Sequence, residues 1–264
     1  MFIKIAQYTI VDQMKAKSFY LLLAMSMGLL FLMRGCYSTD YMINGQQAGG
    51  IWDVSRLIFQ VIVMGMLLMV SMLSMRIFTR DQNDGSMQMF LSRPVKRWEY
   101  VLGRLFGTWF LASGFMLMLH STVFLIVWFQ SGSLNFGYIA ASIICSVNLL
   151  FIVAAISLFS LLMPDFISVL FALGLLCTGF VSDGGYRLLN SELFTAVTSS
   201  GTQPPPALWR ILYPKLFMVQ AYADTLISQS EFMNLGPIHP IINVLGFTLL
   251  LITLTLLVFN KKSI

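Results

Sequence analysis

The chain has 264 residues, of which 58% are hydrophobic and only 10% are Asp, Glu, Lys or Arg. A soluble domain carries about 25% charged residues, so this composition excludes an ordinary water-soluble protein and indicates a protein of the lipid bilayer. The formal net charge is +5, from 16 basic and 11 acidic residues. The distribution of the basic residues therefore bears on how the chain is oriented in a membrane.

The first expected element is a helix within residues 2–17 that lies along the membrane interface. Apolar residues recur near one helical face, namely Phe2, Ile3, Ala6, Ile10 and Met14. Lys4, Gln7 and Lys15 lie away from that face, as in an amphipathic helix. The alternative is an ordinary basic flank of the first membrane span.

Six apolar runs are candidates for membrane spans, because a bilayer core of ~30 Å needs about 20 apolar residues per helix. They are residues 19–33, 57–75, 105–129, 136–163, 166–181 and 241–259. The first run follows basic residues, as a cleaved signal does, but Arg34 stands where cleavage needs a small residue. The sequence therefore predicts an all-α membrane protein, with residues 1–264 as a single transmembrane domain.

The basic residues gather on one side of these spans. With both termini inside, eleven of the 16 are inside, namely Lys4, Lys15, Lys17, Arg76, Arg80, Arg93, Lys96, Arg97, Arg104, Lys261 and Lys262. The other five are Arg34, Arg56, Arg187, Arg210 and Lys215. Cytoplasmic loops carry the excess of Lys and Arg, so we expect both termini in the cytoplasm and residues 182–240 outside.

Residues 182–240 form a long segment that glycines and prolines interrupt. The interruptions are Asp183-Gly184-Gly185, Pro204-Pro205-Pro206, Pro214, Pro237 and Pro240. Between them, residues 208–217 are too apolar for a free loop and too short to span a bilayer. We expect short extracytoplasmic helices before the last span, interfacial or partly re-entrant, that form an ordered outer cap.

Residues 76–100 are a polar island between two apolar runs, with the sequence RIFTRDQNDGSMQMFLSRPVKRWEY. Asp84 or Ser86 can cap a short helix, and Met87, Phe90 and Leu91 then share one face at i, i+3 and i+4.

Pro94 ends this helix, and Arg93, Lys96 and Arg97 form a basic cluster around that end. A short helix with an exposed apolar face at a membrane surface predicts a partner groove. The alternative is a helix that only lies on the lipid.

This loop resembles the first cytoplasmic loop of permease subunits of type-2 ABC transporters, a six-span exporter family. That loop reads as an acidic residue, Gly-Thr or Gly-Ser, a leucine-rich stretch, Ser-x-Pro-Val or Ser-x-Pro-Ile, a basic residue, and later Gly-Lys or Gly-Arg. The matching residues are Asp81, Gly85-Ser86, Met87 to Leu91, Ser92-Arg93-Pro94-Val95, Arg97 and Gly103-Arg104. The family usually has Glu at position 81 and Leu at positions 87 and 89, so the chain departs there while keeping charge and apolarity.

The resemblance implies a coupling helix, at residues 84–93, in a cleft of a separate ABC ATP-binding subunit present in two copies. The residues it assigns to coupling are Asp81, Asp84, Gly85, Ser86, Met87, Phe90, Leu91, Ser92, Arg93, Pro94 and Arg97. It also implies a second permease chain, as a homodimer or with a related chain, in the bacterial inner membrane.

No Gly-Lys pair occurs in the chain, so a phosphate-binding loop is not expected here. ATP and Mg²⁺ are expected in the partner subunit, with no cofactor in this chain, no nucleic-acid partner and no enzyme activity of its own. The alternative, from another class, is a non-transport membrane subunit of an ABC-type complex that passes ATP-driven motion to an extracytoplasmic partner.

Two enzyme or metal interpretations are weak. Asp81-x-x-Asp84-Gly85 begins like the metal motif of phosphatidyltransferases, but no acidic residue lies between Glu99 and Asp165 to complete it. His-Glu-x-x-His and Gly-x-Ser signatures of an intramembrane enzyme are not found either.

His120, Ser146 and Asn148 are polar residues deep in the spans. A hairpin centred on Ser133 brings all three together, as helix-packing contacts or as the lining of a substrate path. Metal ligation by His120 is the remaining alternative, without a second ligand nearby.

Overall fold

The computed structural model describes residues 2–15, 20, 24, 27–28, 42–43, 46–47, 51–75, 77–78, 81, 85, 96–132, 134–189, 213–232 and 238–261. Its helices are α1 (Phe2–Met14), α3 (Ile51–Ser74), α6 (Arg97–Ser131), α7 (Gly137–Leu162), α8 (Asp165–Leu189), α10 (Leu216–Ser228) and α11 (Pro240–Lys261). Two short antiparallel strands, β1 (Met42–Ile43) and β2 (Gln46–Gln47), pair Met42 with Gln47. The rest of the regular structure in the described residues is helical.

Within the described residues, five helices are long and apolar enough to cross a membrane, as expected for a multi-pass membrane protein. They are Val54–Ser74, Arg97–Phe129, Gly137–Leu162, Asp165–Gly185 and Pro240–Lys261. The first predicted span, residues 19–33, lies outside the described residues except for Tyr20, Ala24, Met27 and Gly28. Of these, Met27 contacts α6, where the Thr122 hydroxyl donates to its sulfur at 3.8 Å.

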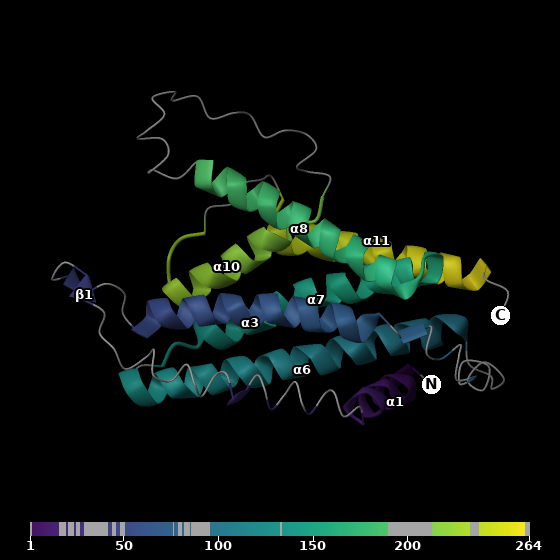
Figure 1. Cartoon of the computed structure of the whole chain (residues 1–264), viewed down its shortest axis with the longest axis horizontal. Coiled ribbons are helices and arrows are strands. Elements are labelled where there is room, and N and C mark those ends of the chain that lie inside the picture. Colours follow the sequence, from purple (N-terminus) through teal and green to yellow (C-terminus); the bar gives the residue numbers. More distant parts are fainter. Residues whose placement is uncertain are drawn as a thin grey trace.

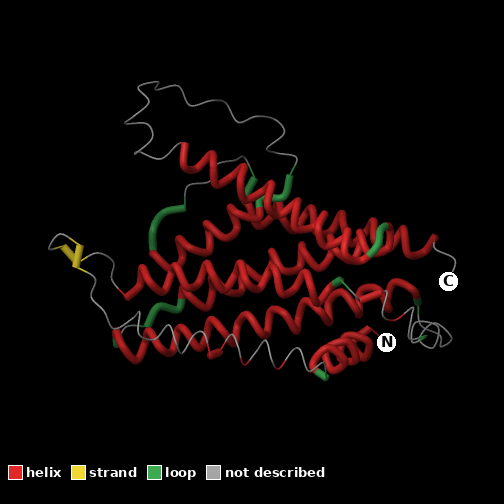
Figure 2. Tube along the Cα trace, viewed as in Figure 1, coloured by secondary structure: helices red, strands yellow, loops and turns green. Residues whose placement is uncertain are grey.

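The bundle has two distinct ends. Both termini lie at the same end (Figure 1), which we call the terminal end. The other, the distal end, carries the start of α3, the end of α6 and the start of α7. Successive long helices therefore alternate in direction along the bundle (Figure 2).

α7 is the central helix. In its most apolar stretch 67% of the residues are buried, against 28% for both α8 and α11. Residues 149–156 are all buried, with at most 8% of any side chain exposed. A helix that is apolar all round belongs in the middle of a bundle, so α7 organises the core while α8 and α11 keep apolar faces outside it.

Two helices extend well beyond the spans expected from the sequence, and each contains a charged residue that bonds to a distant partner. α6 begins at Arg97 where residue 105 was predicted, and it includes Arg104, which pairs with Asp81. α8 continues to Leu189 through the Gly184-Gly185 break expected at its end. There the buried Asp183 accepts a hydrogen bond from the Tyr213 hydroxyl, and a buried polar group requires such a partner.

α10 begins deep within the bundle. The Asn148 amide donates to the Leu216 carbonyl at 3.0 Å, and Asn148 lies ~17 Å along α7 from Gly137 at ~1.5 Å per residue. At its other end, Asn135 donates to the Ile227 carbonyl at 2.8 Å. α10 therefore covers the distal half of α7, where the sequence predicts short helices outside the membrane.

Candidate functional site

A buried ionic cluster lies at the terminal end, and we call it the Arg104 cluster (Tyr8, Thr9, Asp81, Tyr100 and Arg104). The Arg104 guanidinium donates to the Asp81 carboxylate at 2.5 Å, with side chains only 4% and 6% exposed. The Tyr100 hydroxyl donates to Oδ2 of the same carboxylate. Arg104 also contacts Thr9 Oγ1 at 3.5 Å and lies 5.1 Å from the Tyr8 ring centre.

Apolar side chains close around this cluster and exclude water from it. The buried neighbours are Ile5, Ile77, Phe78, Val101, Leu161 and Phe259. The Tyr100 and Phe259 rings stack with centroids 5.9 Å apart. A buried ion pair requires well-placed partners on both charges, and here the carboxylate receives donors from two residues.

Two glycines allow α1 to lie directly on α6. A Cβ at Gly103 would come within 2.8 Å of Ile5, and one at Gly107 within 2.8 Å of the Ala6 carbonyl. The Gly103-x-x-x-Gly107 spacing is typical of close helix contact. α1 packs through Ile5 and Thr9, which are buried, and leaves Ile3 and Val11 exposed.

Most of the predicted coupling residues lie outside the described part of the chain. These are Asp84, Ser86, Met87, Phe90, Leu91, Ser92, Arg93 and Pro94. Gly85 is described and adopts a positive φ of 68°, which favours glycine. Arg97 opens α6 and donates to the Asn260 carbonyl at 3.2 Å, which ties the start of α6 to the end of α11.

His120, Ser146 and Asn148 each form a hydrogen bond with a different partner. His120 Nδ1 contacts Ser142 Oγ at 2.7 Å, and the ring stacks on Phe59 at 4.3 Å. Ser142 is one helical turn from Ser146, so the α6–α7 hairpin is offset from the expected centre at Ser133. The three residues instead make separate contacts.

Asn148 and Ser146 differ in what they contact. Asn148 reaches α10 through the Leu216 carbonyl. Ser146 Oγ donates to Ile143 of its own helix at 2.6 Å, while its carbonyl accepts from Trp109 at 2.8 Å. The hydrogen bonds of His120 and Asn148 therefore join neighbouring helices, and a role in lining a substrate path stays a prediction.

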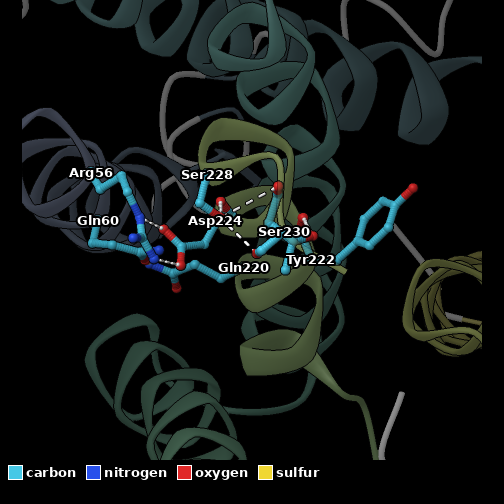
Figure 3. A network of polar contacts seen from close by, with 8 residues as sticks. Arg56, Gln60, Gln220, Tyr222, Asp224, Ser228 and Ser230 are labelled. Atoms are coloured by element: carbon cyan, nitrogen blue, oxygen red, sulfur yellow. Dashed lines mark hydrogen bonds and ion pairs between the residues drawn. The ribbon is translucent and has the colours of Figure 1, made fainter. Parts of the chain in front are cut away.

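A second polar cluster, which we call the α3–α10 ladder, lies in the distal half and was not recognised in the sequence (Figure 3). Arg56 donates to both carboxylate oxygens of Asp224, at 2.9 and 2.5 Å. One helical turn further from the distal end, the Gln220 amide donates to Gln60. Arg56 and Gln60 are four residues apart, as are Gln220 and Asp224. This matched spacing is the signal in the sequence that could have indicated the cluster.

An apolar groove of about 450 Å³ lies between α3, α8 and α10, next to the ladder. It is lined by Gln60, Val61, Met64, Gly65, Phe180, Phe217 and Gln220. The Phe180 and Phe217 rings meet edge to face at 5.5 Å and form one wall. Gln60 and Gln220 are therefore the polar groups of a cavity that is otherwise apolar.

Among the described residues, no group of three or more His, Cys, Asp or Glu residues is placed to hold a metal ion. Comparison with known proteins gives no match, either to a protein-family model or to a curated protein.

Proposed function

We propose that this chain is the membrane permease subunit of an ATP-driven ABC exporter. The observation that carries the proposal is the Asp81–Arg104 ion pair, 2.5 Å long and almost fully buried. Asp81 and Arg104 are the first and last residues of the loop pattern that resembles the permease family. Their contact supports a loop that begins and ends at one place on the bundle, as a docking element requires.

The Arg104 cluster gives such a loop a mechanical connection to the helices. Asp81 belongs to the loop, Arg104 to α6 and Thr9 to α1, and all three are buried. A force applied to residues 84–93 by an ATP-binding subunit would reach α6 and α1 through these contacts. We therefore assign the ATP-binding cleft of the partner to the terminal end.

In this proposal both termini are cytoplasmic, α1 lies along the cytoplasmic interface, and two permease chains assemble. α1 exposes Ile3, Val11 and Met14 together with Lys4 and Lys15, a mixture suited to a membrane interface. The low burial of α8 and α11, 28% in each case, leaves apolar surface for lipid or for a second chain.

The decisive test is complex formation with the ATP-binding subunit. Phe90 and Leu91 are the proposed apolar anchors, and truncating a buried interface anchor costs about 2 to 4 kcal/mol. We expect the Phe90→Ala, Leu91→Ala double variant to lose the co-purifying ATP-binding subunit. Phe129→Ala is the matched control, because Phe129 is 80% exposed at the distal end of α6.

If the double variant keeps the full complex and full cargo-stimulated ATP hydrolysis, the coupling assignment is wrong. A complex that forms and hydrolyses ATP, yet moves no cargo in vesicles, would favour the non-transport alternative with an extracytoplasmic partner.

Orientation is tested with single cysteines in a background lacking Cys36, Cys145 and Cys177. Lys15→Cys marks the terminal end and Ser230→Cys the distal end, and both residues are exposed. In intact cells we expect a membrane-impermeant thiol reagent to label position 230 and not position 15. The reverse labelling would place the docking loop outside the cell and overturn the proposal.

A further inference from the structure

We propose that the groove between α3, α8 and α10 binds the alkyl chain of an uncharged membrane amphiphile whose head group donates a hydrogen bond to Gln220. The groove volume of about 450 Å³ lies within the ~300 to 1,000 Å³ typical of small-molecule sites. This inference does not depend on the proposed transport function, since it needs neither ATP nor a partner subunit.

The first observation is an unsatisfied acceptor on a residue that lines the groove. Gln220 is only 3% exposed, and its amide nitrogen is used by Gln60. Its Oε1 atom has no hydrogen-bond partner among the described residues. A buried acceptor without a partner is costly, so a ligand with a hydroxyl or amide N–H would satisfy a group that the described residues leave open.

The second observation is the change of polarity along the groove. Arg56 and Asp224 lie one turn beyond Gln60 and Gln220 toward the distal end (Figure 3). Toward the middle of the bundle the lining is apolar, from Met64, Gly65 and Phe217. A molecule with one polar head and one apolar chain matches this order, with its head toward the distal end.

The third observation concerns charge. Arg56 contacts both oxygens of Asp224, so the two charges next to Gln60 and Gln220 compensate each other. A charged head group at this depth requires a counter-charge, whereas an uncharged donor requires only the Gln220 oxygen. The geometry therefore selects a hydroxyl or amide head over a phosphate or ammonium.

The fourth observation is the route of entry. Val61 and Met64 line the groove and are 57% and 37% exposed. They lie on an exposed apolar stripe of α3 that continues to Leu68 and Met72. In a membrane-spanning bundle such a stripe faces lipid tails, so an amphiphile reaches the groove sideways from the bilayer.

The test uses the full chain in phosphatidylcholine nanodiscs and two photoreactive probes. One is a diazirine-bearing twelve-carbon alcohol, and the other is its methyl ether, which cannot donate a hydrogen bond. After irradiation, labelled residues are located by mass spectrometry. We expect label on α3 near residues 61–65 and on α10 near Phe217, with the alcohol labelling about fivefold more than the ether, the ratio given by one hydrogen bond of ordinary net strength.

Two variants separate the roles of the polar and apolar parts. Gln220→Leu is expected to bring the alcohol-to-ether ratio to about one. Gly65→Leu is expected to abolish groove labelling by both probes, because nothing lies within 4 Å of a Cβ at Gly65 and the larger side chain enters the groove. Gly246→Leu on α11 is the matched control, since Gly246 is exposed with equal space.

Equal labelling by the two probes in the wild-type protein would overturn the hydrogen-bond assignment. Label spread over the exposed faces of α8 and α11, and unchanged by Gly65→Leu, would mean ordinary lipid contact and overturn the site. If Gly65→Leu fails to fold, a competition experiment on the wild-type protein tests the site instead. Unlabelled dodecanol must then displace the wild-type groove label more strongly than its methyl ether, and equal displacement rejects the proposal.

Discussion

The two polar clusters of this bundle use the same chemistry in different surroundings. The Asp81–Arg104 pair at the terminal end has side chains 6% and 4% exposed, whereas the Arg56–Asp224 pair in the distal half has side chains 35% and 16% exposed. Separating a buried pair leaves charges without water, while separating a partly exposed pair returns them to it. The Arg104 cluster is therefore suited to a fixed joint and the α3–α10 ladder to a contact that can open.

The two clusters also differ in what they connect. The Arg104 cluster joins α1, α6 and the Asp81 segment, so one residue change there affects three parts of the chain. The ladder joins α3 and α10 through two successive polar pairs. Variants at the two sites should therefore differ both in size of effect and in how far the effect spreads.

The largest effect is expected from Arg104→Met, which leaves the Asp81 carboxylate buried without its cation. Breaking a buried pair by removing one partner costs about 3 to 5 kcal/mol. We expect a marked fall in the unfolding temperature of the purified chain, followed by intrinsic fluorescence on heating. An unchanged transition would show that the pair does not hold the terminal end together.

A double variant sharpens this result. Asp81→Leu combined with Arg104→Met removes both charges, and replacing a whole buried pair with apolar residues is often neutral. We expect the double variant to recover most of the stability that Arg104→Met loses. A double variant as unstable as the single one would mean that packing around Tyr8 and Tyr100, and not the uncompensated charge, dominates.

The next effect concerns the contact of α1 with α6. Gly107→Val places carbon atoms within 2.8 Å of the Ala6 carbonyl and Thr9 Cβ, and overpacking of this kind costs about 1 to 3 kcal/mol. We expect α1 to move away from α6, seen as a longer distance between spin labels at the exposed positions Gln7 and Phe110.

Gly114→Val, two turns along the same helix, is the control for this change. Nothing lies within 4 Å of a Cβ at Gly114, so the label distance should not change. If Gly107→Val also leaves the distance between the labels unchanged, the glycine contact does not hold α1 against α6.

The sequence predicted five of the spanning helices but misplaced several of their ends, for one physical reason. The predicted spans begin or end close to charged residues, yet Arg104, Asp183 and Arg56 lie inside helices. Their partners Asp81, Tyr213 and Asp224 are 23, 30 and 168 positions away. Pairing at such separations depends on the folded arrangement, which a local hydropathy pattern does not contain.

The site residues also divide into local features, which the sequence indicates, and contacts that depend on the folded arrangement. The Gly103-x-x-x-Gly107 spacing is a local signal of close helix contact, because backbone approach depends on residue size. The partner of His120 was misjudged by one turn, as Ser142 and not Ser146, because the relative stagger of two helices is set by their loop and packing. The coupling helix at residues 84–93 stays a prediction.

A smaller effect is expected from Asn148→Leu, which removes the hydrogen bond that holds the start of α10. Such bonds between membrane helices average about 0.6 kcal/mol and reach about 1.7. We expect faster hydrogen exchange at the backbone amides of residues 216–228. Ser146→Ala is the control, since that hydroxyl bonds only within α7 among the described contacts. Equal exchange in both variants would show that the Asn148 hydrogen bond does not stabilise α10.

The smallest effect is expected from Arg56→Gln, which breaks the exposed ion pair of the ladder and keeps a polar side chain. Partly exposed pairs contribute about 0 to 1 kcal/mol, so the unfolding temperature should change little. Salt screens such pairs, so any difference between the wild-type protein and Arg56→Gln should shrink between 10 mM and 1 M NaCl, where the Debye length falls from about 30 to 3 Å. The Arg104→Met loss should not respond to salt, because that pair is buried. If Arg56→Gln lowered the unfolding temperature as much as Arg104→Met and independently of salt, the two pairs would not differ as a fixed joint and an opening contact. α10 would then be held permanently against α3.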